Sequence, residues 1–264
     1  MSLKLLAKGV ARAILPTAVF EKRMAVRSRR FQLSGLKKSG LIDATTRYIE
    51  RYGSTVRYGP FAGTIYPMDA ALSHHSIPKL LGTYEQELHH IINIIGQRQY
   101  DLVIDIGSAE GYYAVGLARL LRTKVLAYEP EPIEKSFCEK AARLNGVSEL
   151  IELRELFRAS DVRFFQGRRV LCICDCEGFE SEIFNASTVP DVAGWDLLIE
   201  LHGDAAERLL GLSWPQQTII ITREPRFKSY QELGGLGDQE TLLSEGRADN
   251  QTWLWCDSQI GLQY

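Results

Sequence analysis

Short apolar runs alternate with helical patterns in the part of the chain that follows Gly82. The apolar positions of 84–95 recur at helical spacing, so that Leu88, Ile91 and Ile95 share one face. After this helix we expect seven strands, at 102–106, 124–129, 150–154, 170–175, 196–201, 218–222 and 251–256. Helical segments separate the first five strands, notably 111–122 and 134–145. Near-continuous apolar strands joined by helices indicate a parallel sheet that is covered on both faces.

The predicted fold is therefore α/β: a Rossmann-like, doubly wound and mostly parallel seven-stranded sheet with a helical N-terminal extension. No long helix separates the last two strands, so these two could pair antiparallel. Residues 41–80 mix turn formers with short β-like pieces at 54–58 and 63–66, and we expect them to form a cap. We divide the chain into a basic N-terminal arm and cap, residues 1–78, and a main domain, residues 79–264.

The N-terminal arm differs in charge from the rest of the chain. Residues 1–40 carry ten lysines and arginines against one glutamate, although the whole chain has a net charge of −2. A helix that ends at Pro16 would have an apolar and a basic face, formed by Leu3, Leu6 and Val10 and by Lys4, Lys8 and Arg12. The apolar face can be buried against this chain, against a second subunit of a homo-oligomer or in a membrane surface, and the sequence leaves these three open.

The overall composition argues against several classes of protein. A net charge of −2 and an isoelectric point of about 6.2 give no bias toward a nucleic-acid partner. No apolar run approaches the ~18 residues of a membrane span, and Lys8 and Arg12 interrupt the apolar core that a signal peptide needs. An odd number of cysteines argues against a disulfide framework, so we expect a cytoplasmic protein. Cys172, Cys174 and Cys176 alternate along one predicted strand, with sulfurs roughly 6–7 Å apart, too far to share a zinc ion.

A turn rich in glycine follows the first strand. The strand ends at Asp105, and Gly107, Ser108 and Gly111 form the turn before the next helix. In an open α/β sheet the ligand lies outside the carboxyl ends of the strands, where glycines let the backbone approach it closely. The G-x-x-x-G spacing differs from the G-x-G-x-x-G of dinucleotide sites, and Glu110 would repel a phosphate. S-adenosylmethionine has no phosphate but carries a sulfonium and an ammonium group, whose charge suits Asp105 and, as a second candidate, Glu110.

The second strand also ends in an acidic residue. Glu129 lies about 20 residues beyond the turn, where an acidic side chain accepts hydrogen bonds from ribose hydroxyls, and Pro130 follows it. Together the turn and this strand end resemble the class I methyltransferase fingerprint. They predict a binding site for S-adenosylmethionine that is formed by Asp105, Gly107, Ser108, Gly111, Glu129 and Pro130.

Two further strand ends carry charged side chains. The segment LCICDCEGFE places Asp175, Glu177 and Glu180 just past the fourth strand. The segment LLIELHGD places Glu200 and His202 at the end of the fifth strand. In a doubly wound sheet both ends open onto the same crevice as Asp105 and Glu129, so we expect these groups to converge there.

The DxEGxE and ExH segments, together with the DxGxxxG turn and the acidic second strand, resemble the FkbM-type family of class I S-adenosylmethionine-dependent methyltransferases. The resemblance covers residues 79–202 and includes LLGTYEQEL at 80–88, which places Glu85 among the cofactor-binding residues. Members of that family are mostly O-methyltransferases of sugars, polyketides and other small metabolites. The resemblance therefore implies a small-molecule or glycan acceptor, whereas residues 1–78 show no such match.

Methyl transfer to a hydroxyl requires removal of its proton. His202 is the first candidate base because imidazole titrates near neutral pH, and Asp175 is the second. Asp175, Glu200 and His202 could instead hold a hard divalent cation that acidifies the hydroxyl. Glu177 and Glu180 open the next predicted helix, so each could simply complement its dipole. A methyltransferase of RNA or protein that docks through the basic arm, and a non-catalytic cofactor-binding scaffold, stay open as alternatives.

Overall fold

The computed structural model describes residues 33–203, 205–214, 217–221, 229–246 and 251–258. The predicted amphipathic helix at the N-terminus lies outside these residues. Within them, no helix is both long enough and apolar enough to cross a membrane.

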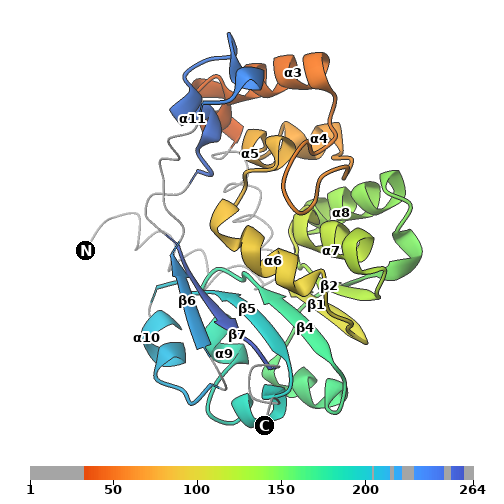
Figure 1. The fold of residues 1–264 in the computed structure, drawn as a ribbon, viewed down its shortest axis with the longest axis vertical. Coiled ribbons are helices and arrows are strands. Elements are labelled where there is room, and N and C mark those ends of the chain that lie inside the picture. Colours follow the sequence, from red (N-terminus) through yellow and green to blue (C-terminus); the bar gives the residue numbers. More distant parts are fainter. Residues whose placement is uncertain (1–32, 204, 215–216, 222–228, 247–250, 259–264) are drawn as a thin grey trace, which may run out of the picture.

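A seven-stranded sheet forms the lower part of the molecule in the view of Figure 1, with the strand order β3-β2-β1-β4-β5-β7-β6. The strands are β1 (Leu102–Ile106), β2 (Val125–Tyr128), β3 (Ile151–Arg154), β4 (Val170–Cys174), β5 (Asp196–Glu200), β6 (Gln217–Ile221) and β7 (Thr252–Cys256). The first five strands pair parallel with their neighbours, whereas β7 is antiparallel to both β5 and β6. The predicted Rossmann-like α/β fold is confirmed, and so is the antiparallel pairing of the last two strands.

Helices cover both faces of the sheet because the strands are apolar on both sides. Along β1, Val103 belongs to one hydrophobic cluster and Ile104 to the other. The first cluster includes the buried faces of α6 (His89–Ile95), α7 (Tyr112–Leu121) and α8 (Pro132–Leu144). The second includes residues of η3 (Ala159–Phe165), α9 (Glu180–Ile183), η4 (Val189–Val192) and α10 (Ala205–Leu210).

The region at 41–80 contains more helix than we expected. Its first part is α3 (Leu41–Tyr52), a helix that was not predicted within this region of turn formers. The helix forms because Leu41, Ala44 and Tyr48 share a buried face that belongs to the first hydrophobic cluster. The two β-like pieces pair through an antiparallel bridge between Thr55 and Ile65 and through backbone hydrogen bonds such as that from the Tyr66 N–H to the Ser54 carbonyl oxygen, at 2.8 Å.

Short helices surround α3 in the upper part of the view in Figure 1. They are α4 (Met68–Ala71), α5 (Ile77–Leu81) and α11 (Gln239–Leu243), the last of which lies against α5. Arg47 of α3 donates a hydrogen bond of 2.7 Å to the carbonyl oxygen of Leu236. The cap therefore packs against a segment from near the C-terminus, and its separation from the main domain at residue 78 stays a prediction.

The helix expected at 84–95 is shorter in the structure. It consists of η1 (Gln86–Leu88) followed directly by α6, and Glu85 before it has a left-handed backbone with φ of 46°. The predicted apolar face is confirmed, since Leu88, Ile91 and Ile95 are all buried. The described residues also include the helical segment 33–38, η2 (Ser148–Leu150) and η5 (Gln231–Leu233).

Candidate functional site

The predicted site residues gather at the carboxyl edge of the sheet. The chain runs outward from β1 to β2 and β3, and then returns to place β4 on the other side of β1. The crevice of a doubly wound sheet lies at such a reversal of strand order. Asp105 lies within β1, Glu129 directly follows β2, and Asp175 directly follows β4. These three carboxylates therefore border the reversal.

Gly107 turns the chain sharply at the end of β1. Its φ is 83°, a conformation that favours glycine, and its N–H donates to the carbonyl oxygen of Tyr128 at 2.9 Å. A Cβ atom at this position would lie 1.7 Å from the carbonyl oxygen of Asp175. Gly111 closes the turn with a φ of 92° and is packed against Cys138. A side chain at either position would collide with another segment of this protein, so both positions require glycine.

Asp105 is buried in a setting that disfavours its charge. Burial, together with the neighbouring Asp175 and Glu129, raises the pKa of the Asp105 carboxyl to about 8. Its Oδ2 and the Oγ of Ser108 are buried without a hydrogen-bond partner among the described residues. Buried polar atoms of this kind are normally satisfied by a ligand or by water. A ligand cation beside Asp105 would satisfy its carboxylate, so these atoms fit the ammonium end of S-adenosylmethionine.

Glu129 joins the turn to the second strand end. Its Oε2 accepts a hydrogen bond from the Ala109 N–H at 3.0 Å, and its Oε1 accepts one from the Glu131 N–H at 2.7 Å. Burial raises the pKa of its carboxyl, and these two backbone donors partly offset that effect. Pro130, by contrast, is exposed. The carboxylate predicted to bind ribose is therefore held rigidly at the edge of the crevice.

Glu110 contacts the cap, so the sequence-based suggestion that it pairs with the cofactor finds no support in its contacts. Its buried carboxylate forms an ion pair with Lys79 and accepts a hydrogen bond from Tyr66. His74 lies 3.8 Å from the same carboxylate. Burial alone would raise the pKa of Glu110, but Lys79 and His74 hold it below its usual value. Glu110 thus ties the cofactor turn to the segment 66–79.

We expect Lys79→Ala to lower the free energy of unfolding by about 2–3 kcal/mol, because it leaves the buried Glu110 carboxylate without its ammonium partner. The matched control is Lys124→Ala, which removes an exposed ion pair with Glu152 and should cost under about 1 kcal/mol. Urea denaturation of both variants measures the difference. Equal losses in the two variants would show that the buried pair contributes no more than the exposed one.

His202 lies at the centre of a group of carboxylates. Its Nδ1 lies 2.9 Å from Oε1 of Glu180. Its Nε2 lies 3.7 Å from Asp175, 3.8 Å from Glu177 and 3.9 Å from Glu200. The structure thus brings together Asp175, Glu200 and His202, as the ends of adjacent parallel strands predict.

The carboxylates change the acidity of the ring. The hydrogen bond with Glu180, and the charges of Asp175 and Glu177, raise the pKa of His202 above its usual 6.5, although partial burial opposes this. Burial and the charge of Glu85 raise the pKa of Asp175 to about 6. Near neutral pH the histidine and the aspartate therefore compete for protons, and either can exchange one with a bound acceptor.

Asp175, Glu200 and His202 each offer one ligand atom within 4.8 Å of the others. A divalent cation could be held by such a set. The protonated ring of His202 is an alternative source of positive charge for the same carboxylates, and its raised pKa favours that form. The geometry is therefore explained without a metal ion.

Cys172, Cys174 and Cys176 are free thiols in the structure, but the predicted spacing of their sulfurs is wrong. Cys174 and Cys176 have sulfurs only 3.6 Å apart, rather than the expected 6–7 Å. The reason is that β4 ends at Cys174 and the chain turns there, so the alternation of an extended strand does not reach Cys176.

Glu85 directly precedes η1 and contacts α7 and the segment around Glu245. It is buried, its carboxylate accepts a hydrogen bond from Tyr113, and its N–H donates to Glu245 at 2.9 Å. Its charge acts on Asp175, so it belongs to the same electrostatic cluster. Sequence reasoning missed Tyr113 and Glu245, since each is brought there by tertiary packing and neither stands in a recognisable motif.

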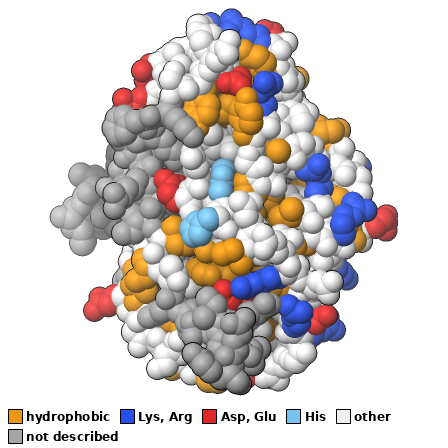
Figure 2. Space-filling view, viewed as in Figure 1, with side chains coloured by type: hydrophobic (Ala, Val, Ile, Leu, Met, Phe, Trp, Pro, Cys, Tyr) orange, Lys and Arg blue, Asp and Glu red, His pale blue; other side chains and the backbone are white. Residues whose placement is uncertain are grey.

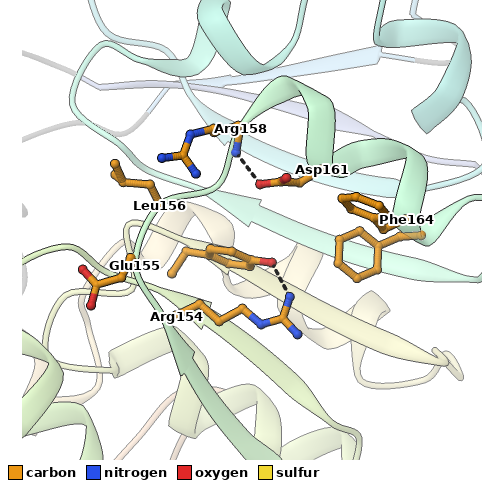
Figure 3. A pocket seen from close by; sticks show the side chains of 8 residues that line it. Arg154, Glu155, Leu156, Arg158, Asp161 and Phe164 are labelled. Carbon is orange, nitrogen blue, oxygen red and sulfur yellow. Dashed lines mark hydrogen bonds between the residues drawn. The ribbon is translucent and has the colours of Figure 1, made fainter.

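A cavity of about 460 Å³ opens at the ends of β2 and β3 (Figure 3). Figure 3 shows the Arg154 side chain donating a hydrogen bond to the Tyr128 hydroxyl, at 2.9 Å. Tyr128 belongs to the second hydrophobic cluster, so this cavity lies on the face of the sheet opposite to α7. Its lining contains none of the predicted site residues; it consists of Tyr128, Arg154, Glu155, Leu156, Arg158, Asp161, Phe164 and Phe165.

No protein-family model matches the chain, and no curated protein sequence matches it. Among solved structures, precorrin 8w decarboxylase from Methanobacterium thermoautotrophicum is 15% identical over 65% of this chain and 89% of that chain, with a TM-score of 0.45. An rRNA methylase from Streptococcus thermophilus is 15% identical over 65% and 96%, with a TM-score of 0.42. The O-methyltransferase TomG from Streptomyces achromogenes is 17% identical over 69% and 86%, with a TM-score of 0.41. At such identities the similarity is one of overall fold, and the resemblance to FkbM-type enzymes stays a prediction.

Proposed function

We propose that the protein is an S-adenosylmethionine-dependent methyltransferase that transfers a methyl group to a hydroxyl of a small molecule or glycan. The observation that carries this proposal is the arrangement at the strand reversal. There, Asp105 is buried with an unpaired oxygen next to the Gly107 turn and Glu129, while His202 and Asp175 follow the adjacent strands. The residues predicted to bind the cofactor and those proposed to accept a proton thus lie on one edge of the sheet.

The residues at the turn have distinct roles in this proposal. Asp105 would pair with the ammonium group of the cofactor, and Glu129 would accept hydrogen bonds from the ribose hydroxyls in addition to those from its two backbone donors. Ser108 offers a buried hydroxyl that has no partner among the described residues. When bound, the cofactor supplies an electrophilic methyl group.

His202 and Asp175 would act on the acceptor. A hydroxyl placed beside Nε2 of His202 loses its proton to that nitrogen, or to Asp175, as its oxygen takes the methyl group. The side chain of Phe179, in the loop between β4 and α9, is 67% exposed and offers an aromatic surface for a ring of the acceptor. Figure 2 shows one face of the molecule, on which lysine and arginine side chains lie mostly in the right half of the view.

A transfer assay tests the proposal. The protein is incubated with S-adenosylmethionine that carries a tritiated methyl group and, in separate reactions, with pools of hydroxylated metabolites, glycans, RNA or protein. We expect label in the metabolite or glycan pools, and none when His202→Ala replaces the wild type. Label confined to RNA or protein would contradict the acceptor class, and binding without transfer in every pool would indicate a scaffold. Sensitivity of the transfer to EDTA would instead indicate the metal-assisted alternative.

With the acceptor found in that assay, the rate should rise with pH through a midpoint above 6.5. The reason is that His202 must be neutral to accept a proton, and its carboxylate neighbours raise its pKa above 6.5. Initial rates between pH 5.5 and 9 measure the midpoint. A rate that is already maximal at pH 5.5 would exclude His202 as the base.

A further inference from the structure

Glu180 contacts both His202 and the loop after β4 that carries Asp175 and Glu177. It is the first residue of α9, and its side chain is fully buried. Its Oε1 lies 2.9 Å from Nδ1 of His202, and it accepts hydrogen bonds from the N–H groups of Cys176 and Gly178, each at 3.2 Å. One carboxylate oxygen therefore joins the loop after β4 to His202, two residues beyond β5.

The loop that Glu180 binds is strained. Glu177 has a φ of 57°, a left-handed conformation that is unfavourable for a residue with a Cβ, and Gly178 follows with a φ of 102°. Such a conformation persists only where the surroundings enforce it. The two N–H groups that Glu180 accepts from belong to the residues on either side of Glu177. The carboxylate thus stabilises the turn that places Asp175 and Glu177 beside His202.

We propose that Glu180 is a positioning residue: it holds His202 in the tautomer with its proton on Nδ1, and it holds the loop that carries Asp175. The carboxylate accepts the Nδ1 proton, so the lone pair of the neutral ring lies on Nε2. That nitrogen is the one nearest to Asp175, Glu177 and Glu200. Glu180 acts through His202 and through the loop, on the Nδ1 side of the ring.

The catalytic consequence of this assignment rests on the proposed methyl transfer, whereas the tautomer itself does not. A neutral ring with its proton on Nε2 would present a donor to the acceptor hydroxyl instead of a proton-accepting lone pair. The helix-dipole role that the sequence allows for Glu180 is insufficient, because its Oε1 is engaged by a side chain and by two loop N–H groups.

The nitrogen-15 chemical shifts of the imidazole test the assignment directly in the wild-type protein. His202 is assigned by comparison with His202→Asn. Above the pKa of the ring we expect the Nδ1–H tautomer to predominate. A predominant Nε2–H tautomer would overturn the proposal, and this result needs no variant of Glu180.

Glu180→Gln supplies the second measurement, with Glu182→Gln as control because Glu182 is an exposed glutamate of the same helix. Loss of the Glu180 charge should lower the pKa of His202, although Asp175, Glu177 and Glu200 still face Nε2. The tautomer preference should weaken as well. Equal titration curves in both variants would overturn the proposal. If Glu180→Gln does not fold, as shown by circular dichroism, the wild-type tautomer decides.

Calorimetry on the same samples separates this inference from the proposed function. Folded Glu180→Gln should bind S-adenosylmethionine within about threefold of the wild type, since Glu180 contacts none of the predicted cofactor residues. With the acceptor, kcat should fall while KM for the cofactor stays unchanged, and the pH profile should move to lower pH. Absence of cofactor binding in the wild type would refute the methyltransferase assignment and leave the tautomer result standing.

Discussion

Gly107→Ala is expected to abolish binding of S-adenosylmethionine and to lower the free energy of unfolding by about 3–5 kcal/mol. The added Cβ would lie 1.7 Å from the carbonyl oxygen of Asp175, a backbone atom that cannot rotate away. The φ of 83° adds the strain of a left-handed alanine, roughly 1–2 kcal/mol. Relief of the clash requires that the turn and the loop after β4 move apart, which separates Asp105 from Asp175.

Gly146→Ala is the matched control for this substitution. Gly146 also has a left-handed backbone, with a φ of 63°, but a Cβ there meets no atom within 4 Å. It should therefore cost only the conformational strain, roughly 1–2 kcal/mol, and leave cofactor affinity unchanged. Urea denaturation and calorimetry of both variants measure these effects. If Gly107→Ala behaved like Gly146→Ala, the close contact between the turn and the loop after β4 would be disproved.

Asp105 should make the free protein less stable as the pH rises. In the folded protein its pKa is about 8, raised from 3.8, so between these values the folded state retains a proton that the unfolded state has lost. The contribution of this group is therefore fully present below pH 3.8 and declines by roughly 1.4 kcal/mol per pH unit up to pH 8. Between pH 5 and pH 8 the loss amounts to about 4 kcal/mol.

Asp105→Asn removes this dependence because an amide does not titrate in that range. Urea denaturation at pH 5, 6, 7 and 8 should give a shallower slope for the variant than for the wild type. Parallel slopes for the two proteins would show that the pKa of Asp105 is not raised.

The same carboxyl should release a proton when it pairs with a ligand cation. At pH 7 the free protein holds Asp105 mostly protonated, and a bound ammonium group favours the carboxylate. The apparent binding enthalpy of S-adenosylmethionine should then vary with the ionisation enthalpy of the buffer, with a slope close to one proton. Asp105→Asn should abolish this slope, whereas an unchanged slope would place the cation elsewhere.

The sequence predicts the sheet well because its strands are buried on both faces. β1 occupies the predicted residues, and each of the other strands differs by at most one residue at either end. A continuous apolar run can be buried in few other ways than as a strand inside a covered sheet. The strand and the charged residue at its end can therefore both be predicted from the sequence. The charged residues at the ends of β1, β2, β4 and β5 lie at the same edge of the sheet, as expected.

Features that depend on tertiary contacts could not be predicted from the sequence. The helix α3 contains Thr45 and Thr46 among its apolar positions, which weakens its helical pattern, and its buried face is defined only by the packed cluster around it. The roles of Glu110 and Glu180 depend on partners 31 and 22 residues away in the chain. The predicted distance between the cysteine sulfurs was wrong because a local turn ends β4 before Cys176.

The most direct test of the central claim is calorimetry of the purified protein with S-adenosylmethionine, S-adenosylhomocysteine and NAD. We expect the first two to bind and NAD to give no heat. Glu129→Ala should weaken binding by roughly 1–3 kcal/mol, because Glu129 is the predicted acceptor for the ribose hydroxyls. The exposed Glu139→Ala, on α8, should leave it unchanged. Binding of NAD without S-adenosylmethionine, or equal affinities of the Glu129→Ala and Glu139→Ala variants, would contradict the account.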